Sequence, residues 1–259
     1  MDADHRKQIV VSVVSHGQGQ LVVNLLQAIQ SLCDHSTLLV IVTVNIPEQL
    51  PLAPDRFPFP VVIVRNAVPK GYGANHNAAF KLIEGDTFCV LNPDIRLTTD
   101  PFAALFEHIR ALKAGVVAPL ILSPEGRIED SARHMITPLR IVKRVCRLGK
   151  VLDYEIGTAP IAADWMAGMF LMFSSRTFAE IGGFDEHYYM YCEDADICTR
   201  LREIGQGVWL IPSMKVIHDA RRQSHRDPRH FWWHINSMAR FCTKHRISYR
   251  SAGARLDHY

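Results

Sequence analysis

A chain of 259 residues that is 48% hydrophobic and 21% charged has the composition of an ordinary globular protein. It is long enough to bury a full core in one large α/β domain or two small ones. No apolar run reaches the roughly 20 residues that a membrane-spanning helix needs, and no apolar signal-peptide core follows the polar residues 1–8. We therefore expect a protein of the cytoplasm.

The net charge of +3 is distributed unevenly, because lysines and arginines far outnumber acidic residues from Arg200 to the end. Such a basic tail suits an anionic partner, either a membrane surface or a phosphate-bearing substrate, but it is equally typical of a solvated face. No nucleic-acid recognition module accompanies the basic stretch, so we expect no nucleic-acid partner.

The first half of the chain alternates short apolar strands with helical patterns. Apolar, β-branched runs predict strands at residues 9–15, 38–44, 61–64 and 87–91, and apolar residues at helical spacing predict helices at residues 21–32 and 74–83. This alternation predicts an α/β fold with a doubly wound, mostly parallel sheet and helices on both faces. Ligands of such a sheet bind beyond the carboxyl ends of its strands.

The second half returns to this pattern after an interruption. We expect a strand at residues 116–122 and then a basic, irregular excursion or lid over residues 123–160. Helices are predicted at residues 175–181 and 194–204, and a short strand at residues 208–211 is expected to end at Pro212.

Asn92, Pro93 and Asp94 directly follow the predicted strand at residues 87–91. Oxygen ligands at the carboxyl edge of a parallel sheet lie where phosphate-bearing ligands bind, and they suit a divalent cation. The same three residues also form a common turn, so the pattern alone leaves both interpretations open.

Three carboxylates, Glu193, Asp194 and Asp196, lie within four residues of one another. Acids complement the dipole at the beginning of a helix, a structural role that fits Asp196 well. Their crowding also suits a catalytic site in which one carboxylate stays ionised as a base while the others shape its surroundings. The sequence by itself supports either role.

His218 follows a predicted strand and precedes a group of side chains that resembles a phosphate-binding surface, namely Arg221, Arg222, Ser224 and Arg226. A lone histidine is more often structural than a ligand. The sequence pattern alone therefore leaves open whether His218 has a structural or a functional role.

Three segments together resemble the family 2 glycosyltransferases of the GT-A fold: NAVPKGYGANHNAA, VLNPDIRL, and the run from DWMAGMFLMF to MKVIHD. Within that family the chain looks most similar to the rhamnosyltransferase-like enzymes of bacterial surface polysaccharide assembly, which include those of lipopolysaccharide. The likeness covers roughly residues 9–245. It implies a single catalytic domain at residues 1–220, with a nucleotide-sugar half at about 1–120 and an acceptor half at 121–220, followed by a basic, aromatic helical tail at 221–259.

The resemblance also assigns chemistry to individual residues. Asp94 stands in the metal-binding motif, and His218 matches a late histidine that supplies a second protein ligand, a mixed set that favours Mn²⁺ slightly over Mg²⁺. Asp194 matches the catalytic base, with Glu193 beside it. In such enzymes the base takes a proton from the acceptor hydroxyl, and the cation stabilises the departing nucleoside diphosphate.

The remaining matched positions are expected to bind the two substrates. On the donor side they are Ser15, His16, Gly71, Asn75, Asn77, Asn92 and Asp94, with Asn45 or Glu48 in place of the usual aspartate near the nucleobase. On the acceptor side they are Asp164 and Trp165. Ser15-His16-Gly17 also replaces the family's aromatic-Asn pair, so the nucleobase stays open. The family implies inverting transfer from a dTDP- or UDP-linked sugar, with dTDP-rhamnose as the leading donor, to a hydroxyl of a glycan or lipid-linked glycan.

Three other classes of protein compete with this interpretation. A dinucleotide-dependent oxidoreductase would also begin with a buried strand and a glycine-bearing loop, but the third glycine of its motif would fall at Val22. A sugar nucleotidyltransferase has a similar sheet, yet the sequence lacks the glycine- and basic-rich loop expected near its start. A catalytically inactive glycan-binding or nucleotide-sugar-binding relative would not need Asp94, Asp194 and His218 together.

The tail reads as a helix that starts at Asp227-Pro228. Apolar residues recur there at helical spacing and are flanked by basic ones: Phe231, Ile235, Met238 and Cys242, with Trp232 nearby, and Arg229, Arg240, Lys244, Arg246 and Arg250. One hypothesis is peripheral contact with the anionic inner face of the cytoplasmic membrane. The alternative is a helix that packs its apolar face onto the catalytic domain.

Overall fold

The structure is a computed structural model in which residues 8–137, 152–219 and 228–245 are described. The predicted phosphate-binding group at Arg221, Arg222, Ser224 and Arg226 lies outside these residues, as do Arg246 and Arg250 of the tail. In the described ranges, none of the helices combines the length and the apolar character needed to cross a bilayer.

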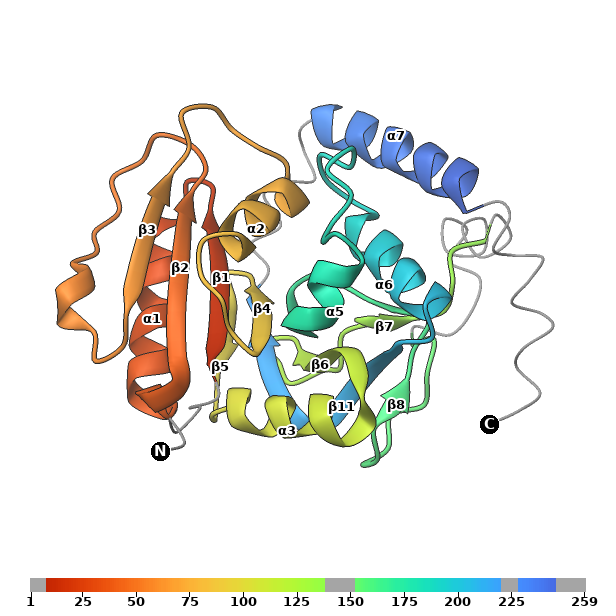
Figure 1. Cartoon of the computed structure of the whole chain (residues 1–259), viewed down its shortest axis with the longest axis horizontal. Helices are drawn as coiled ribbons and strands as arrows, with labels where there is room; N and C mark the ends of the chain where they lie inside the picture. The colour runs from red at the N-terminus through yellow and green to blue at the C-terminus, as the bar shows by residue number, and fades with distance from the viewer. Residues whose placement is uncertain (1–7, 138–151, 220–227, 246–259) are drawn as a thin grey trace.

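A nine-stranded sheet forms the centre of the fold, in the order β3-β2-β1-β4-β10-β6-β11-β5, with β8 (Ile161–Ala162) paired to β11 (Figure 1). Its first half consists of the parallel strands β1 (Ile9–Ser15), β2 (Leu38–Val44), β3 (Val61–Arg65) and β4 (Thr87–Leu91). All residues of β2 and β4 are buried, because helices cover both faces of this part of the sheet.

The second half of the sheet mixes parallel and antiparallel pairs. Its strands are β5 (Ile95–Leu97), β6 (Ala114–Leu122), β10 (Phe170–Ser174) and β11 (Gly207–His218). Strand β11 runs parallel to β6, whereas β10 is antiparallel to both β4 and β6. A separate ribbon pairs β7 (Ala132–Arg133) with β9 (Trp165–Met166).

Two hydrophobic cores lie on opposite faces of the sheet because alternate strand residues point in opposite directions. Helices α1 (Gly19–Leu32) and α3 (Phe102–Leu112) pack with Val11 and Val13 of β1 in one core. Helices α2 (Tyr72–Phe80), α5 (Ser175–Glu180) and α6 (Glu193–Glu203) pack with Val10 in the other. Short 3₁₀ turns, His35–Thr37 and Pro54–Arg56, precede β2 and β3.

These elements confirm the predicted fold class, and β1, β2 and β4 have the predicted bounds. The prediction that Pro212 ends the last strand is wrong, since β11 continues to His218. The pairing of β11 with β6 shifts register between Ile211 and Lys215. At such an irregularity the regular backbone hydrogen bonds between the strands are already absent. A proline there, which lacks an N–H, removes none of them and does not end the strand. Strand β5 and helix α3 were not predicted.

Helix α7 (Pro228–Lys244) packs against the domain above α6 (Figure 1), which confirms both the predicted helix start and the packing alternative. Phe241 is fully buried in the second core, and Ser237 Oγ donates to the carbonyl oxygen of Met190 at 2.8 Å. The predicted apolar stripe is nevertheless divided: Met238 packs on the core, but 64% of Phe231 and 41% of Ile235 are exposed.

Ion pairs add to this docking through Asp196, which is completely buried. Its carboxylate lies 2.8 Å from Arg200 Nε, 2.6 Å from Lys244 Nζ and 2.8 Å from His245 Nε2. Burial opposes ionisation of Asp196, but the hydrogen bond from His245 and the charge of Arg200 outweigh burial and hold its pKa below the usual value. Asp196 therefore has a structural role, as the helix-start interpretation allowed.

Asp196→Asn keeps the shape of the side chain but leaves Arg200 and Lys244 facing a neutral group. Removing one partner of a buried ion pair costs roughly 3–5 kcal/mol, and we expect a loss of that size in the free energy of unfolding, measured by urea denaturation at pH 7. The control is Glu107→Gln, which breaks the exposed 3.8 Å pair with Arg110. It should change stability by less than about 1 kcal/mol.

The advantage of the wild type over Asp196→Asn should also depend on pH. Because the folded-state pKa of Asp196 is depressed, its stabilisation is complete above the unfolded-state pKa of about 3.9. The stabilisation is then lost as the pH falls through the folded-state pKa. An advantage that grew on acidification would contradict the assignment.

Candidate active site

The predicted site residues of the first half of the chain meet at one edge of the sheet. Ser15 ends β1, the backbone N–H of Asn45 donates to its carbonyl oxygen at 2.9 Å, and Asn92 follows β4. The start of β10 reaches the same edge, because β10 is antiparallel to β4 and the N–H of Asn92 donates to Met169 at 2.9 Å. The carboxyl edge of the parallel strands is thus where the candidate residues gather, as the fold class predicted.

The side chain of Asn45 holds the loop that leads into α2. Its Oδ1 accepts from the N–H of Lys70 at 2.8 Å and from Asn66 Nδ2 at 2.8 Å, and its Nδ2 contacts Lys70 O at 3.0 Å and His16 Nδ1 at 3.1 Å. Asn75 adds a hydrogen bond from its Nδ2 to the carbonyl oxygen of Gly71 at 3.0 Å. These amides fix the shape of the predicted donor-binding loop.

Glu48 caps helix α1 from outside the helix. Its two carboxylate oxygens accept from the N–H groups of Gly17 and Gly19 at 3.0 and 2.9 Å, where α1 lacks a side-chain cap of its own. A carboxylate at this position satisfies orphan N–H groups and complements the helix dipole. Ser15 Oγ accepts from the N–H of Gln18 nearby, at 3.3 Å.

Asp94 and His218 meet at the sheet edge, where β5 and β11 pair. Asp94 Oδ2 lies 3.4 Å from His218 Nε2, and Asp94 Oδ1 is buried without a hydrogen-bond partner. The other ring nitrogen, Nδ1, lies 2.9 Å from Oε2 of Glu129. Burial disfavours the charged ring, but the neighbouring carboxylates of Asp94 and Glu129 prevail and raise the pKa of His218.

This arrangement fits a divalent cation with two protein ligands. A buried carboxylate oxygen that lacks a partner, next to an imidazole nitrogen, is a mixed oxygen and nitrogen donor set of the kind Mn²⁺ accepts. Among the described residues, no three His, Cys, Asp or Glu side chains form a group that could hold a metal by themselves. Water and the phosphates of a bound substrate commonly supply the remaining ligands of such a cation.

A sharp turn before α6 places the acids Glu193 and Asp194 in the same region as Asp94. Tyr191 and Cys192 have φ values of 72° and 64°, left-handed conformations that non-glycine residues rarely adopt and that cluster at functional sites. Asp194 Oδ2 accepts from the N–H of Gly168 at 3.0 Å, just before β10. Burial raises the pKa of Asp194, against the hydrogen bonds that stabilise its charge.

Glu193 has a different environment from its neighbour. Only 6% of Glu193 is exposed, and its buried Oε2 lacks a hydrogen-bond partner. Burial, and then the charge of Asp194, raise the pKa of Glu193 well above the usual value. Two adjacent buried carboxyls avoid double ionisation, so the pair favours an ionised Asp194 beside a protonated Glu193.

Tyr72, which the sequence interpretation missed, connects the Asp94 side of the site to the Asp194 side. Its hydroxyl donates to the carbonyl oxygen of Gly168 and lies 3.2 Å from Asn92 Oδ1. Burial raises its pKa, and the charges of Glu193, Asp194 and Asp94 add to this effect. Tyr72 begins α2 directly after Gly71, so the KGYG segment was the signal that could have identified it.

Asp164 and Trp165, the predicted acceptor-binding residues, are held by the segment around β7. The indole N–H of Trp165 donates to His134 O at 2.9 Å, and Asp164 Oδ2 accepts from the N–H of Met135 at 2.7 Å. The guanidinium of Arg133 lies 5.0 Å from the centroid of the Trp165 ring, and its charge acts on Asp194. Arg133 also escaped the sequence interpretation, because only the pairing of β7 with β9 places it beside Trp165.

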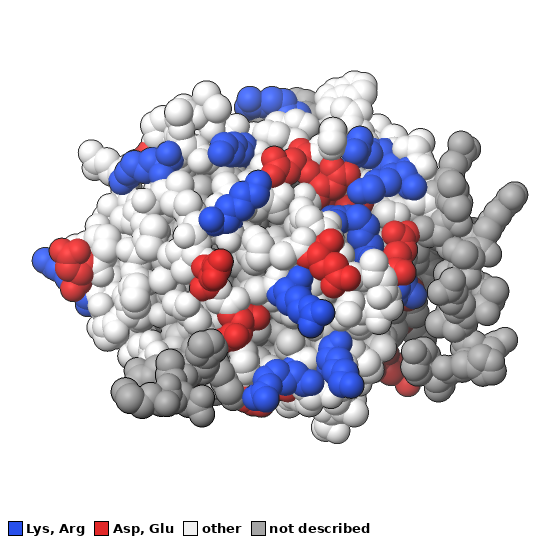
Figure 2. Space-filling view, in the orientation of Figure 1, with Lys and Arg blue, Asp and Glu red and all other residues white. Residues whose placement is uncertain are grey.

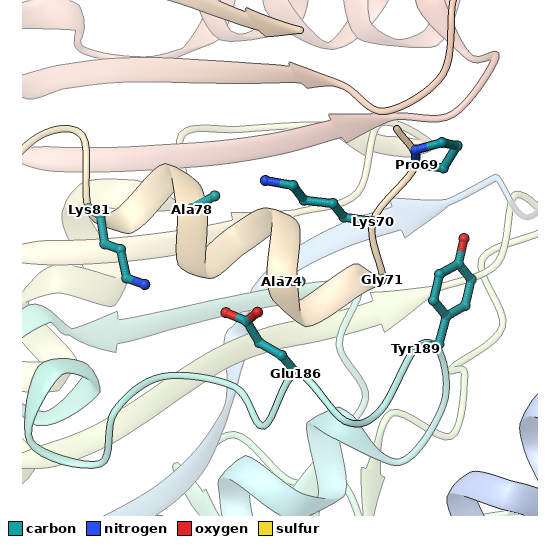
Figure 3. A pocket seen from close by; sticks show the side chains of 8 residues that line it. All are labelled: Pro69, Lys70, Gly71, Ala74, Ala78, Lys81, Glu186 and Tyr189. Carbon is teal, nitrogen blue, oxygen red and sulfur yellow. The ribbon is translucent and has the colours of Figure 1, made fainter. Parts of the chain in front are cut away.

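A pocket of about 580 Å³ lies along the outer side of α2 (Figure 3). Figure 3 shows two walls, one from α2 and the loop before it and one from the loop that precedes α6; the lining residues are Pro69, Lys70, Gly71, Ala74, Ala78, Lys81, Glu186 and Tyr189. A Cβ on Gly71 would lie 2.7 Å from the carbonyl oxygen of Tyr189, so the two walls touch at this glycine. Gly71 is the one predicted site residue in the lining, and the pocket does not include Asp94, His218 or Asp194.

The chain is similar to curated glycosyltransferases, although no protein-family model matches it. It is 28% identical to rhamnosyltransferase WbbL of Escherichia coli (strain K12) over 193 residues, which are 68% of this chain and 72% of WbbL. It is 31% identical to the N-acetylglucosaminyl-diphospho-decaprenol L-rhamnosyltransferase of Mycobacterium tuberculosis (strain CDC 1551 / Oshkosh) over 154 residues, which cover 55% of this chain and 50% of that enzyme. The match therefore spans only half of the mycobacterial relative.

Among solved structures, the crystal structure of GalNAc-T7 with UDP, GalNAc and Mn²⁺ superposes with a TM-score of 0.68 at 16% sequence identity. The match covers 93% of this chain and 48% of that one. This neighbour has the GT-A fold, so the fold expected from the resemblance is confirmed.

Proposed function

We propose that the chain, a rhamnosyltransferase-like member of the family 2 glycosyltransferases with the GT-A fold, transfers a sugar from a nucleoside-diphosphate donor. The acceptor is a hydroxyl of a glycan or lipid-linked glycan, and the transfer inverts the configuration at the anomeric carbon. The leading donor is dTDP-rhamnose, since the relatives matched by sequence are named rhamnosyltransferases. A UDP-linked sugar is the alternative, because the sequence leaves the nucleobase open. Asn45 and Glu48, either of which is a candidate to replace the usual aspartate, both make protein contacts.

One observation supports the proposal: two side chains suited to bind a cation and a candidate catalytic base are linked within one region of the fold. Asp94 and His218 form the first, Asp194 is the second, and Tyr72 contacts elements of both through Asn92 and Gly168. Glycosyl transfer needs both groups at once, because a poor nucleophile must lose a proton while the nucleoside diphosphate departs with an additional negative charge.

The reaction follows from these positions. The acceptor oxygen attacks the anomeric carbon opposite the diphosphate, its proton passes to a carboxylate oxygen of Asp194, and the bond between the carbon and the diphosphate oxygen breaks. The N–H groups of Gly168 and Ala195 hold the two carboxylate oxygens of Asp194 at 3.0 and 2.8 Å and so fix its orientation. A divalent cation bound by Asp94 and His218, Mn²⁺ or Mg²⁺, would stabilise the charge of the departing nucleoside diphosphate.

Two competing functions give different products. A sugar nucleotidyltransferase would join a sugar phosphate to a nucleoside triphosphate and release pyrophosphate. A catalytically inactive relative would bind nucleotide sugar without turning it over. Incubation of dTDP-rhamnose and UDP-sugars with Mn²⁺, with and without glycan acceptors, separates these classes by whether nucleoside diphosphate is released.

Asp94→Ala should abolish turnover and weaken the binding of dTDP or UDP in the presence of Mn²⁺, because it removes the oxygen ligand of the cation. Binding is measured by calorimetry with and without Mn²⁺. The control, Asp55→Asn, removes a carboxylate from an exposed turn and should leave both quantities unchanged. Full wild-type activity in excess EDTA would show that the site works without a cation.

Asp194→Asn should lower kcat by roughly 10²–10⁴-fold, because the amide cannot accept the proton. Donor affinity should change little, since the base acts on the acceptor. In the wild type the base works only when ionised, and its pKa is raised. Activity should therefore fall on the acid side at a higher pH than the value of about 3.9 typical of an exposed aspartate. Near-normal activity of Asp194→Asn together with an inactive Glu193→Gln would transfer the role to Glu193.

The exposed face of α7 supports a lipid-linked acceptor. Of its apolar side chains, 64% of Phe231, 61% of Trp232 and 41% of Ile235 are exposed. The mycobacterial relative is named for a diphospho-decaprenol acceptor, which resides in a membrane. Arg240 and Lys244 lie within 3.1 Å and 2.8 Å of Asp185 and so are paired with an acid of the domain. Acidic and basic side chains are also interspersed on the side of the molecule drawn in Figure 2. Because Arg240 and Lys244 are paired in this way, we assign the membrane contact mainly to the apolar residues.

Replacing Phe231, Trp232 and Ile235 together by Ser should reduce co-sedimentation with anionic liposomes at least several-fold, because burial of these side chains in the interface is lost. The matched control replaces three exposed apolar residues elsewhere, Leu32, Leu82 and Ile204, by Ser and should bind as the wild type does. Equal binding by both triple variants would exclude this face of α7 as the contact.

A further inference from the structure

We propose that Glu129 is a positioning residue for the metal ligand His218: it holds the proton of the ring on Nδ1, so that Nε2 presents its lone pair to a cation at Asp94. The proposal rests on the proposed function, which places a divalent cation between Asp94 and His218. It adds a residue that acts through the histidine and contacts neither substrate nor cation.

The position of Glu129 is set by a short hairpin after β6. The N–H of Glu129 donates to Ile121 O at 2.9 Å, and Ser123 N donates to Arg127 O at 2.7 Å to close the turn. Leu122 and Ile128 form an isolated antiparallel bridge beside it. The carboxylate of Glu129 is therefore held by backbone pairing and lies 2.9 Å from His218 Nδ1, although the two residues are 89 positions apart.

The two sides of the imidazole face two carboxylates. A neutral ring carries one proton, and the short contact with Glu129 places this proton on Nδ1. The lone pair of Nε2 then points at Asp94 Oδ2 across 3.4 Å, so two acceptors face each other. Asp94 Oδ1, buried and without a partner, adds a third unused lone-pair site. A cation between Asp94 and His218 satisfies all three atoms.

Without Glu129 the proton would be free to move to Nε2, where it would donate to Asp94. That hydrogen bond would occupy both atoms that are needed as ligands. A carboxylate behind a metal-bound histidine has this tautomer-fixing role in many metal sites, and its loss typically lowers metal affinity roughly 10–100-fold. Glu129 thus contributes to cation affinity, and any effect of Glu129 on sugar transfer follows from that change in cation affinity.

The experiment measures Mn²⁺ binding by electron paramagnetic resonance at a fixed, saturating concentration of dTDP or UDP, for the wild type and two variants of Glu129. Glu129→Leu removes the acceptor and should raise the Kd for Mn²⁺ roughly 10–100-fold. Glu129→Gln keeps an oxygen that can accept from Nδ1 and should lose clearly less affinity than Glu129→Leu. The matched control, Glu125→Gln, removes the same charge from an exposed position on the same hairpin and should bind Mn²⁺ as the wild type does.

A second measurement keeps the inference testable without metal. Nitrogen-15 NMR of the metal-free protein is recorded at alkaline pH, where the ring is neutral, with the His218 signals identified by their loss in His218→Asn, and should show the Nδ1–H form in the wild type. Glu129→Leu should shift the ring towards the Nε2–H form while thermal melting confirms that the variant is folded. An unchanged tautomer, or a Kd for Mn²⁺ in Glu129→Leu equal to that of the wild type, would overturn the inference. Failure of the wild type itself to bind Mn²⁺ would instead refute the proposed cation site, and the tautomer result would still decide the role of Glu129.

Discussion

The hydroxyl of Tyr72 is the contact on which the geometry of the candidate site depends. It donates to the carbonyl oxygen of Gly168, whose own N–H holds the carboxylate of Asp194, and it lies 3.2 Å from Asn92, two residues before Asp94. The proposed cation site and the candidate base are thereby joined through one partly buried side chain at the start of α2. Because the hydroxyl contacts residues next to both strands, it also fixes where the end of β4 lies relative to the start of β10.

The acids of the site are carried by a turn that local preferences do not favour. Left-handed residues such as Tyr191 and Cys192 cost on the order of 1–3 kcal/mol each and persist only where the surroundings fix them. Here α2 and α7 enclose the turn. The N–H of Tyr72 donates to Tyr189 O at 2.9 Å, and His230 of α7 lies 2.8 Å from the hydroxyl of Tyr191. The tail helix therefore supports the turn that precedes Asp194 with one face, while Phe231, Trp232 and Ile235 are exposed on another.

The segment from Ile128 to Arg133 contributes to both sides of the site. Glu129 reaches the histidine of the proposed cation site, and four residues later Arg133 lies against Trp165 and acts on Asp194. One segment can serve both because backbone pairing fixes each end: the N–H of Glu129 donates to Ile121 O, and β7 pairs with β9. The surroundings of the proposed cation site and of the candidate acceptor-binding residues are therefore set by one piece of chain, between β6 and the ribbon of β7 and β9.

The sequence by itself determined the central strands, the fold class and the chemical types at the site. Burial on both faces allows only short, apolar, β-branched runs, so β1, β2 and β4 were predictable to the residue. The family resemblance made Asp94, Asp194 and His218 the candidates for the site. Tertiary structure decided which side chains meet. In the folded chain β11 continues through Pro212, where its pairing with β6 is irregular. Asp196 pairs with Lys244, Glu129 contacts His218, and Tyr72 contacts Gly168. These contacts join residues far apart in the chain, and no local pattern encodes them, because they depend on how separately formed elements pack against one another.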